Sequence, residues 1–250
     1  KSPERSTLMS ARYDAIGINY LALRTPDRRI ASAIEQALGD AKNILNVGAG
    51  TGSYEPQDRA VTAVEPSAEM IRQRRPGTAK VVQASAEDLP FDDKAFDAAM
   101  GVLTVHHWAD AQAGLREVRR VTRGPIVLLT FDPSFRPWLT DYLPQLAVLD
   151  DDRMPAMARY QEWLGDIDVT TVPIPHDCTD GFLYAFWRRP AAYLDPHIRS
   201  GSSSFWAIEG ADEGLERLRH DLDSGEWERR YDKLVNLDAY DAGYRLIVSR

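Results

Sequence analysis

The chain has 250 residues, of which 44% are hydrophobic and 27% charged, and its formal net charge at pH 7 is −8. The acidic balance disfavours a nucleic-acid partner because phosphate binding depends on lysine and arginine, and no apolar run approaches the roughly 20 residues of a membrane-spanning helix. Because Cys178 is the only cysteine and the first ten residues lack the apolar core of a signal peptide, we expect a cytoplasmic protein with no membrane partner.

The first half of the chain alternates helices and strands, as in a doubly wound α/β sheet. Apolar residues at helical spacing predict a helix over 26–38, with Gly39 at its end. A strand over 43–47 leads directly into a glycine-rich loop. The elements expected after this loop are a strand at 60–66, a helix capped by Ser67 and running to Arg75, strands at 79–85 and 96–105, a helix at 111–121, and a strand at 125–131.

The second half of the chain has a different character. Residues 133–166 are rich in Trp, Tyr, Leu, Met and Pro, which indicates a helical insertion. Strands at 168–175 and 243–249 are expected to complete a seven-stranded sheet, and the segment between them is far longer than a hairpin needs. The expected organisation is an N-terminal helical lid at 1–39, a core at 40–132, a helical cap insertion at 133–166, and final strands at 167–250 with a second cap insertion at about 176–241.

Gly48, Gly50 and Gly52 alternate in the loop that follows the first strand. Glycine turns sharply there and lets the backbone approach a ligand closely. A dinucleotide site usually has the pattern G-x-G-x-x-G and a long helix, but Ser53 stands at the last glycine position. Only residues 53–59 separate the loop from the next strand, so this helix is expected to be short. The loop alone indicates either a nucleotide-like cofactor or a structural turn.

Glu65 closes the second strand, and a carboxylate there can accept hydrogen bonds from both ribose hydroxyls of an adenosine cofactor. The alternative is an ordinary surface acid at a strand end. Together with the glycine loop, Glu65 favours adenosine but does not choose between NAD and S-adenosylmethionine. Glu55, shortly after the loop, disfavours NAD because it brings negative charge close to a pyrophosphate.

Two stretches farther along resemble a known family. Residues 84–100, ASAEDLPFDDKAFDAAM, and 103–121, LTVHHWADAQAGLREVRRV, closely resemble the third and fourth motif regions of class I S-adenosylmethionine-dependent methyltransferases, in particular the UbiE-like small-molecule enzymes. The family forms are roughly G-D-A-E-x-L-P-F…F-D, and an L-H-H-W-like segment followed by E-x-x-R-V. The resemblance covers about residues 40–131. It implies a Rossmann-like fold, S-adenosylmethionine as cofactor, and methyl transfer to a small organic acceptor.

The resemblance also implies cofactor contacts, position by position. The implied residues are Val47, Gly48, Ala49, Gly50 and Gly52 at the methionine part, Glu65 at the ribose, Pro66 and Met70 against the adenine, Ser85, Ala86 and Glu87 at the adenine edge, and Gly101 and Val102 near the sulfonium. Two departures stand out. Ser85 replaces an acid that commonly contacts the adenine amino group, and Arg123-Gly124-Pro125 replaces a P-G-G turn.

The segment at 12–27 places Tyr13, Tyr20 and Arg24 ahead of the first predicted helix. In many similar methyltransferases such a segment folds over the cofactor as a lid, and this adds Tyr20 to the implied contacts. The alternative is that both tyrosines staple a short helix.

Methyl transfer from a sulfonium requires alignment and exclusion of water, and it requires a base only for some acceptors. His106 and His107 follow the fourth predicted strand and are the candidate catalytic residues, because imidazole titrates near neutral pH. Alternatively, one histidine caps the next helix while Trp108 packs in the core. Asp132 either orients a substrate or begins a turn. We predict no metal, since the groups at 176–178 have no second cluster at ligand spacing.

Aromatic residues of the second half either line a substrate pocket or form ordinary core: Tyr142, Tyr184, Phe186, Trp187 and Tyr193. The leading hypothesis is an S-adenosylmethionine-dependent methyltransferase acting on an O, N or C atom of a small molecule. Two other hypotheses are a fold relative that binds the cofactor without methylating, such as a cyclase or regulator, and an NAD(P)-dependent oxidoreductase. The acceptor and the oligomeric state are not determined by the sequence.

Overall fold

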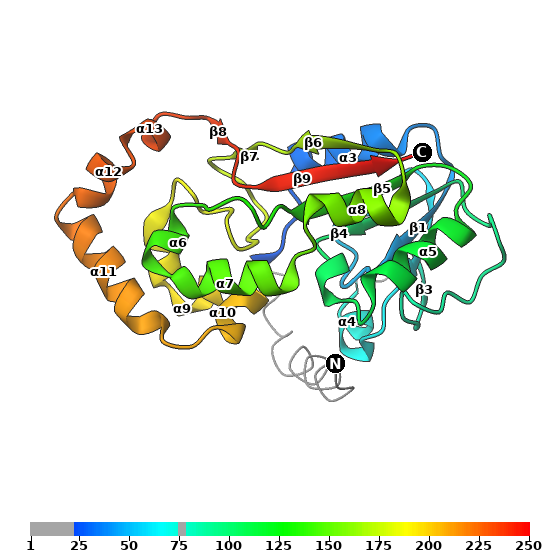
Figure 1. The fold of residues 1–250 in the computed structure, drawn as a ribbon, viewed down its shortest axis with the longest axis horizontal. Helices are drawn as coiled ribbons and strands as arrows, with labels where there is room; N and C mark the ends of the chain where they lie inside the picture. The colour runs from blue at the N-terminus through cyan, green and yellow to red at the C-terminus, as the bar shows by residue number, and fades with distance from the viewer. Residues whose placement is uncertain (1–22, 75–78) are drawn as a thin grey trace.

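A mixed seven-stranded sheet forms the centre of the computed structural model, which describes residues 23–74 and 79–250 (Figure 1). The strand order is β3-β2-β1-β4-β5-β9-β6, and β9 runs antiparallel to both of its neighbours. The strands of this sheet are β1 Asn43–Val47, β2 Ala60–Val64, β3 Lys80–Val82, β4 Ala98–Val102, β5 Ile126–Phe131, β6 Ile167–Thr171 and β9 Tyr244–Ser249. The predicted doubly wound Rossmann-like α/β fold is therefore confirmed.

Helices lie on both faces of this sheet and beyond one end of it. Those that flank the sheet are α3 Arg28–Leu38, α4 Ala68–Arg72, α5 Ala111–Val121 and α8 Met157–Leu164, with the short η2 turn Val105–His107 after β4. The others are α6 Leu139–Tyr142, α7 Pro144–Arg153, η3 Pro190–Leu194, α9 Pro196–Arg199, α10 Ser203–Ala207, α11 Ala211–Asp223, α12 Glu226–Arg230 and α13 Asp232–Val235. No helix among the described residues is long and apolar enough to cross a membrane.

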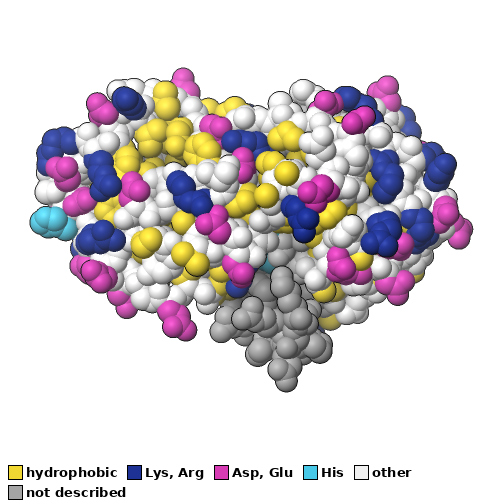
Figure 2. Space-filling model, in the orientation of Figure 1, with side chains coloured by type: hydrophobic (Ala, Val, Ile, Leu, Met, Phe, Trp, Pro, Cys, Tyr) yellow, Lys and Arg dark blue, Asp and Glu magenta, His cyan; other side chains and the backbone are white. Residues whose placement is uncertain are grey.

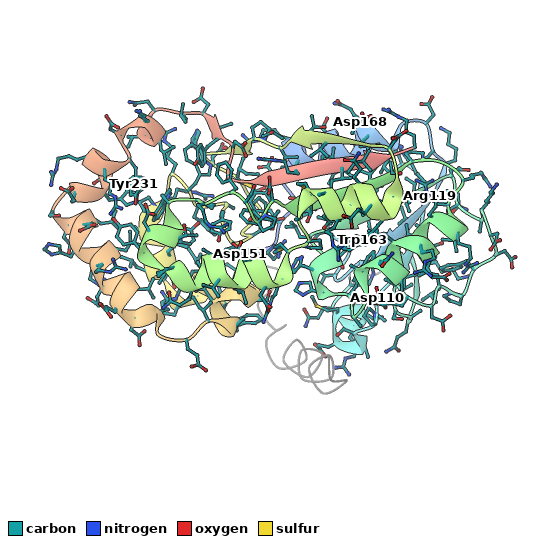
Figure 3. The ribbon with its side chains drawn as sticks, viewed as in Figure 1. Asp110, Arg119, Asp151, Trp163, Asp168 and Tyr231 are labelled. Atoms are coloured by element: carbon teal, nitrogen blue, oxygen red, sulfur yellow. The ribbon has the colours of Figure 1, made fainter. Side chains whose placement is uncertain are left out.

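Each face of the sheet has its own apolar layer. Ile30, Ile34 and Leu38, spaced along one side of α3, pack in the same buried cluster as Met100 and Leu129. On the opposite face, α5 and α8 contribute Leu115, Val118 and Tyr160 to a second buried cluster with strand residues. Arg119 on α5 also donates to the carbonyl and hydroxyl oxygens of Ser249 on β9, and so fastens this helix to the sheet (Figure 3). The sheet is thus buried on both sides, as parallel sheets require.

The remaining helices gather into a cap beyond the carboxyl ends of β4 and β5, at the left of Figure 1. Aromatic side chains hold the cap together: the Trp138 ring centroid lies 5.2 Å from that of Trp227 and 5.7 Å from that of Tyr193. The indole N–H of Trp138 donates to the carbonyl oxygen of Trp187 at 2.8 Å. Of the aromatic residues considered for a substrate pocket, Tyr142, Tyr184, Trp187 and Tyr193 are at most 2% exposed and belong to this core.

The strand predicted over 168–175 is wrong in one respect, because the structure divides it. Residues Ile167–Thr171 form β6, whereas Ile174–Pro175 form β7, which pairs with β8 (Ala239–Tyr240) in a separate two-stranded sheet. Pro173 lies between them and has no N–H to donate to a ladder, which explains the break.

On the face shown in Figure 2, acidic and basic side chains are interspersed across both halves of the molecule.

Candidate active site

The glycine loop after β1 adopts a conformation that requires glycine. Gly48, Gly50 and Gly52 have φ angles of +65°, +51° and +92°, which place all three in the region that side chains disfavour. A Cβ added at Gly48 would lie 1.8 Å from the hydroxyl oxygen of Thr104, in the turn after β4. The loop is therefore fitted closely against the carboxyl end of β4, and no helix follows it before β2 begins at Ala60.

Glu65, at the end of β2, is joined to the glycine loop by its carboxylate. One oxygen accepts a hydrogen bond from the Gly50 backbone nitrogen at 2.7 Å, and the other accepts from the Ser67 backbone nitrogen at 2.9 Å. The residue is only 7% exposed, and this burial raises the pKa of its carboxyl, against the opposing effect of the two backbone donors. Because a carboxylate offers about four acceptor positions, roughly two remain for further donors such as ribose hydroxyls.

A buried ion pair lies beneath the glycine loop, and sequence reasoning did not find it. Arg74 donates to both carboxylate oxygens of Glu55, at 2.6 and 2.7 Å, and to the carbonyl oxygen of Gly50 at 3.1 Å. Asn46 on β1 donates a third hydrogen bond to Glu55 at 2.9 Å. The side chains of the pair are 2–3% exposed. The negative charge of Glu55 is therefore neutralised inside the protein. The guanidinium of Arg74 also stabilises the glycine loop through its hydrogen bond to the Gly50 carbonyl oxygen.

A second buried network joins the exit of the loop to the second half of the chain. Tyr54 has a φ of +64°, and its hydroxyl donates to Asp180 at 2.9 Å while accepting from the Asp27 backbone nitrogen at 3.3 Å. Arg24 donates to the other oxygen of Asp180 at 2.6 Å. Asp180 is fully buried. The glycine loop is thus connected both to the start of α3 and to the segment before η3.

The two candidate catalytic histidines lie in η2, at the carboxyl end of β4. Their ring centroids are 3.9 Å apart, and both side chains are half-buried. Burial is the largest cause that lowers the pKa of each: that of His106 falls well below 6.5, and that of His107 falls to about 4. The positive charges of Arg153 and Arg24 lower both further. At neutral pH both imidazoles are therefore uncharged and can accept a proton, but only as weak bases.

Neither histidine caps the following helix. Asp110 caps α5, with its carboxylate accepting from the Ala113 backbone nitrogen at 3.0 Å. Trp108 packs against α5, since a Cβ added at Gly114 would lie 2.5 Å from its ring, and its indole N–H donates to Thr104 at 3.2 Å. The packing role proposed for Trp108 is thus confirmed, whereas the capping role for a histidine is wrong.

Asp132, at the end of β5, begins a turn. Its carboxylate accepts hydrogen bonds from the backbone nitrogen and the hydroxyl of Ser134, and it lies 3.8 Å from the guanidinium of Arg245. These partners favour the turn over the substrate-orienting role.

The glycine loop, the acid on the neighbouring strand and the motif after β4 now have a common position at one edge of the sheet. A family model described as a methyltransferase domain matches residues 45–125. A solved structure from Anabaena variabilis, assigned provisionally as a methyltransferase from an antibiotic biosynthesis pathway, is 36% identical; the match covers 92% of this chain and 99% of that chain, with a TM-score of 0.84. The chain belongs to the class I S-adenosylmethionine-dependent methyltransferase family.

Curated relatives in this family match a smaller part of the chain. The ubiquinone/menaquinone biosynthesis C-methyltransferase UbiE of Geobacter sp. is 29% identical over 53% of this chain and 64% of its own length. The malonyl-[acyl-carrier protein] O-methyltransferase of Erwinia pyrifoliae is 35% identical over 34% of this chain and 35% of its own length. The chain thus spans less than two thirds of the length of each of these relatives.

The structure brings most of the implied cofactor residues to the same edge of the sheet. A Cβ added at Gly50 would lie 3.8 Å from the Met70 methyl group, and one added at Gly101 would lie 3.6 Å from the Val47 carbonyl oxygen. Ser67 caps α4 as predicted, by accepting from the Met70 backbone nitrogen at 3.2 Å. Of the implied adenine contacts, Pro66 and Ser85 are exposed, Ala86 is buried, and Glu87 accepts from the Asp110 backbone nitrogen at 3.0 Å. Tyr13, Tyr20 and Arg75 lie outside the described residues.

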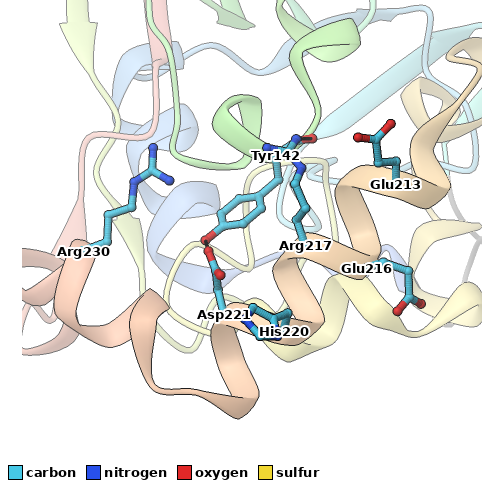
Figure 4. Close-up of a pocket in the computed structure, with 7 residues that line it drawn as sticks. All are labelled: Tyr142, Glu213, Glu216, Arg217, His220, Asp221 and Arg230. Atoms are coloured by element: carbon cyan, nitrogen blue, oxygen red, sulfur yellow. Dashed lines mark hydrogen bonds between the residues drawn. The ribbon is translucent and has the colours of Figure 1, made fainter.

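A pocket of about 370 Å³ opens on the cap, away from these residues (Figure 4). It lies among α6, α11 and α12 and is lined by Tyr142, Glu213, Glu216, Arg217, His220, Asp221 and Arg230. The Tyr142 hydroxyl donates to Asp221 at 2.7 Å, so the one buried polar group in its wall is already satisfied. None of the implied cofactor residues lies in these three helices. Among the described part of the chain, no group of three or more His, Cys, Asp or Glu side chains is arranged to hold a metal ion.

Proposed function

We propose that this chain transfers a methyl group from S-adenosylmethionine to an O, N or C atom of a small organic acceptor. The observation that carries the proposal is the hydrogen bond from the Gly50 backbone to Glu65, because it fixes a carboxylate beside a loop that a ligand can approach closely. Family membership gives the reaction class. The residues fit this cofactor: Gly48, Gly50 and Gly52 have no side chain to block the approach of a ligand to the backbone, and Glu65 retains acceptor capacity.

The proposed roles follow the family positions. The backbone of Val47–Gly52 holds the methionine part, Glu65 accepts from the ribose hydroxyls, and Met70 packs against the adenine, together with Pro66 and the segment 85–87. Gly101 and Val102 lie near the sulfonium. We further propose that the part of residues 1–39 that precedes α3, including Tyr20, acts as a lid over the core at 40–132, since α3 itself packs against the sheet. In this proposed division of the chain, the insertions at 133–166 and about 176–241 cover the side of the site where the methyl acceptor binds.

The catalytic contribution of the protein is mainly alignment and exclusion of water. S-adenosylmethionine, when bound, supplies an electrophilic methyl group on a good leaving group. The turn after β4 is held in one place by Thr104, which fits against Gly48, so the histidines that follow it are presented rigidly. His106 or His107, being uncharged at neutral pH, accepts a proton from an acceptor that must lose one. Their low pKa values restrict them to acceptors that are already acidic or that lose the proton after transfer.

Calorimetry tests the cofactor assignment. Titration of the protein with S-adenosylmethionine and S-adenosylhomocysteine is expected to give saturable binding, whereas NADH is expected to give none. The absence of a long helix after the glycine loop disfavours a pyrophosphate. Binding of NADH in preference to S-adenosylmethionine would contradict the proposal and favour an oxidoreductase.

A second candidate function is a protein that binds the cofactor without methylating, and the weak basicity of the two histidines favours it. Incubation with methyl-labelled S-adenosylmethionine and a panel of phenols, amines and carboxylic acids separates the two candidates. A methyltransferase transfers label to at least one acceptor with matching formation of S-adenosylhomocysteine. A cyclase or regulator binds the cofactor but transfers no label.

A further inference from the structure

Side chains, rather than a helix, hold the chain where it leaves the glycine loop. Residues 53–59, which lead from the loop to β2, contain no helix. Glu55 in this stretch is anchored to Arg74, as described above. Tyr54 has a φ of +64°, in the left-handed region that bulky side chains rarely adopt. Such a conformation costs free energy and persists only where the surrounding contacts enforce it, most often beside a ligand site.

The side chain of Tyr54 supplies these contacts. Its ring lies in the apolar cluster that packs α3 against the sheet, and the residue is 4% exposed. Its hydroxyl donates to a carboxylate oxygen of Asp180 at 2.9 Å and accepts from the Asp27 backbone nitrogen at 3.3 Å. Burial, followed by the charge of Asp180, raises the pKa of Tyr54, so the hydroxyl keeps its proton at neutral pH. The hydroxyl therefore both donates and accepts, and both partners lie outside the loop.

Asp180, the acceptor for this hydroxyl, is itself held by the segment before α3. Arg24 donates to its other carboxylate oxygen at 2.6 Å. Beside this ion pair, the Gly181 backbone nitrogen donates to the Leu23 carbonyl oxygen at 2.9 Å. Asp180 is fully buried. Two segments that are far apart in the sequence thus fix the carboxylate to which Tyr54 donates.

Other contacts fix the start of the glycine loop. Ala49 donates from its backbone nitrogen to the Val64 carbonyl oxygen at 3.0 Å, and Gly50 donates to Glu65 at 2.7 Å. Both bonds join the loop to the end of β2, and both are made within the cofactor-binding half of the chain. The network around Tyr54 therefore acts on the end of the loop, whereas the carboxylate proposed for the ribose is held separately.

We propose that Tyr54 is a positioning residue for cofactor binding, whose hydroxyl, held by Asp180 and Asp27, sets the path of the glycine loop where it receives the methionine part of S-adenosylmethionine. This inference rests on the proposed methyltransferase function, and it adds that the second half of the chain contributes to cofactor affinity. Tyr54 acts through the loop backbone, since its hydroxyl is already engaged within the protein. Without the hydroxyl, the strained residue relaxes and the backbone of Gly52 moves with it.

Calorimetric titration of two ligands into two matched variants tests the proposal. Tyr54→Phe removes only the hydroxyl. Tyr160→Phe removes a similarly buried hydroxyl, bonded to that of Thr130 at 3.0 Å, in the apolar cluster on the opposite face of the sheet. The ligands are S-adenosylhomocysteine and 5′-methylthioadenosine, which lacks the amino-acid part. We expect Tyr54→Phe to lose at least tenfold in affinity for S-adenosylhomocysteine but less than threefold for 5′-methylthioadenosine, and Tyr160→Phe to lose less than twofold for either.

Chemical denaturation without ligand establishes whether both variants are folded at the temperature of the titration. A Tyr54→Phe variant that is unfolded, or that loses affinity equally for the two ligands, would assign the hydroxyl to fold stability and overturn the proposal. Equal losses in Tyr54→Phe and Tyr160→Phe, or wild-type affinity in Tyr54→Phe, would overturn it as well. If wild type fails to bind S-adenosylhomocysteine, the proposed function itself is wrong, which is a distinct result.

Discussion

The carboxylate of Glu65 and the backbone nitrogen of Gly50 form a 2.7 Å hydrogen bond between the end of β2 and the loop after β1. The second oxygen of the same carboxylate accepts from Ser67, at the start of α4. The Glu65 side chain thus positions both the glycine loop and the start of α4, which form the proposed adenosine site, before any ligand binds. Because its geometry is already set, little conformational entropy remains to be lost when the ribose binds.

Replacement of Glu65 by alanine is expected to weaken S-adenosylhomocysteine binding by about 1–3 kcal/mol, which corresponds to roughly fivefold to 150-fold. The loss has two sources, since the ribose hydroxyls and the Gly50 amide both lose their acceptor. Glu65→Gln keeps one carbonyl oxygen of the same shape and is expected to lose less. Isothermal titration measures both variants. Wild-type affinity in Glu65→Ala would remove the ribose assignment.

Alanine at Gly48 is expected to be more destabilising than alanine at Gly39. Both glycines have φ near +60°, but a Cβ at Gly48 would lie 1.8 Å from Thr104, whereas nothing lies within 4 Å of a Cβ at Gly39. A side chain at positive φ costs about 1–3 kcal/mol at either position, and the contact with Thr104 adds about 1–3 kcal/mol more at Gly48 alone. Chemical denaturation compares the free energies of unfolding. Equal losses in the two variants would contradict the close fit of the loop against the turn after β4.

The effects of substituting Glu55 and Arg74 on the free energy of unfolding are expected to be non-additive, because the two side chains form one buried ion pair. Arg74→Met leaves the carboxylate of Glu55 buried without its cation and is expected to cost about 3–5 kcal/mol of unfolding free energy. The double variant Glu55→Gln/Arg74→Met removes both charges while retaining an acceptor for Asn46, and is expected to recover much of this loss. A double variant no more stable than Arg74→Met would show that the contact from Arg74 to the Gly50 carbonyl, rather than the ion pair, carries the effect.

Asp150 is expected to make stability depend on pH. Burial raises its pKa from 3.8 to about 6, although Tyr184 donates to it, so the folded state holds a proton that the unfolded state releases. This contribution is fully present below pH 3.8 and is lost as the pH rises through 6, by about 3 kcal/mol in total. Asp150→Asn removes it, so the stability of the variant relative to wild type is expected to rise between pH 4 and pH 6.

The exposed neighbour supplies the control for that measurement. Asp151→Asn changes an exposed carboxylate beside Arg136 whose charge is the smallest cause of the raised Asp150 pKa, and it is expected to alter the pH dependence far less than Asp150→Asn does. The histidines titrate in the same range with the opposite sign, because their lowered pKa values reduce stability as the pH falls below 6.5. Differences between each variant and wild type cancel this shared contribution. A parallel pH profile for Asp150→Asn and wild type would contradict the raised pKa.

How far the sequence predicts this structure depends on the range of the interactions involved. The strand at 43–47 and the helix at 111–121 match the structure residue for residue, because local apolar periodicity determines them. The meeting of Glu65 with the glycine loop was also predictable, since neighbouring parallel strands end at the same edge of the sheet. The division of the strand at 168–175 was predictable from Pro173, but the prediction followed the apolar pattern across that proline.

Other parts of the site depend on packing between distant segments. Nothing in the sequence spacing between Glu55 and Arg74 indicates that the two form a buried ion pair. The lowered pKa values of His106 and His107 likewise depend on burial and on the charges of Arg24 and Arg153, which are far from them in the sequence. Such contacts appear only when distant segments of the chain are packed together.

We propose that the glycine loop and Glu65 together hold the adenosyl group of S-adenosylmethionine. A crystal structure of the complex with S-adenosylhomocysteine would show where that group binds. We expect the ribose hydroxyls to lie within hydrogen-bonding distance of the Glu65 carboxylate, about 2.5–3.0 Å, while Gly50 keeps its own bond to that side chain. A ribose bound elsewhere, with Glu65 facing only the protein backbone, would show that Glu65 does not hold the adenosyl group.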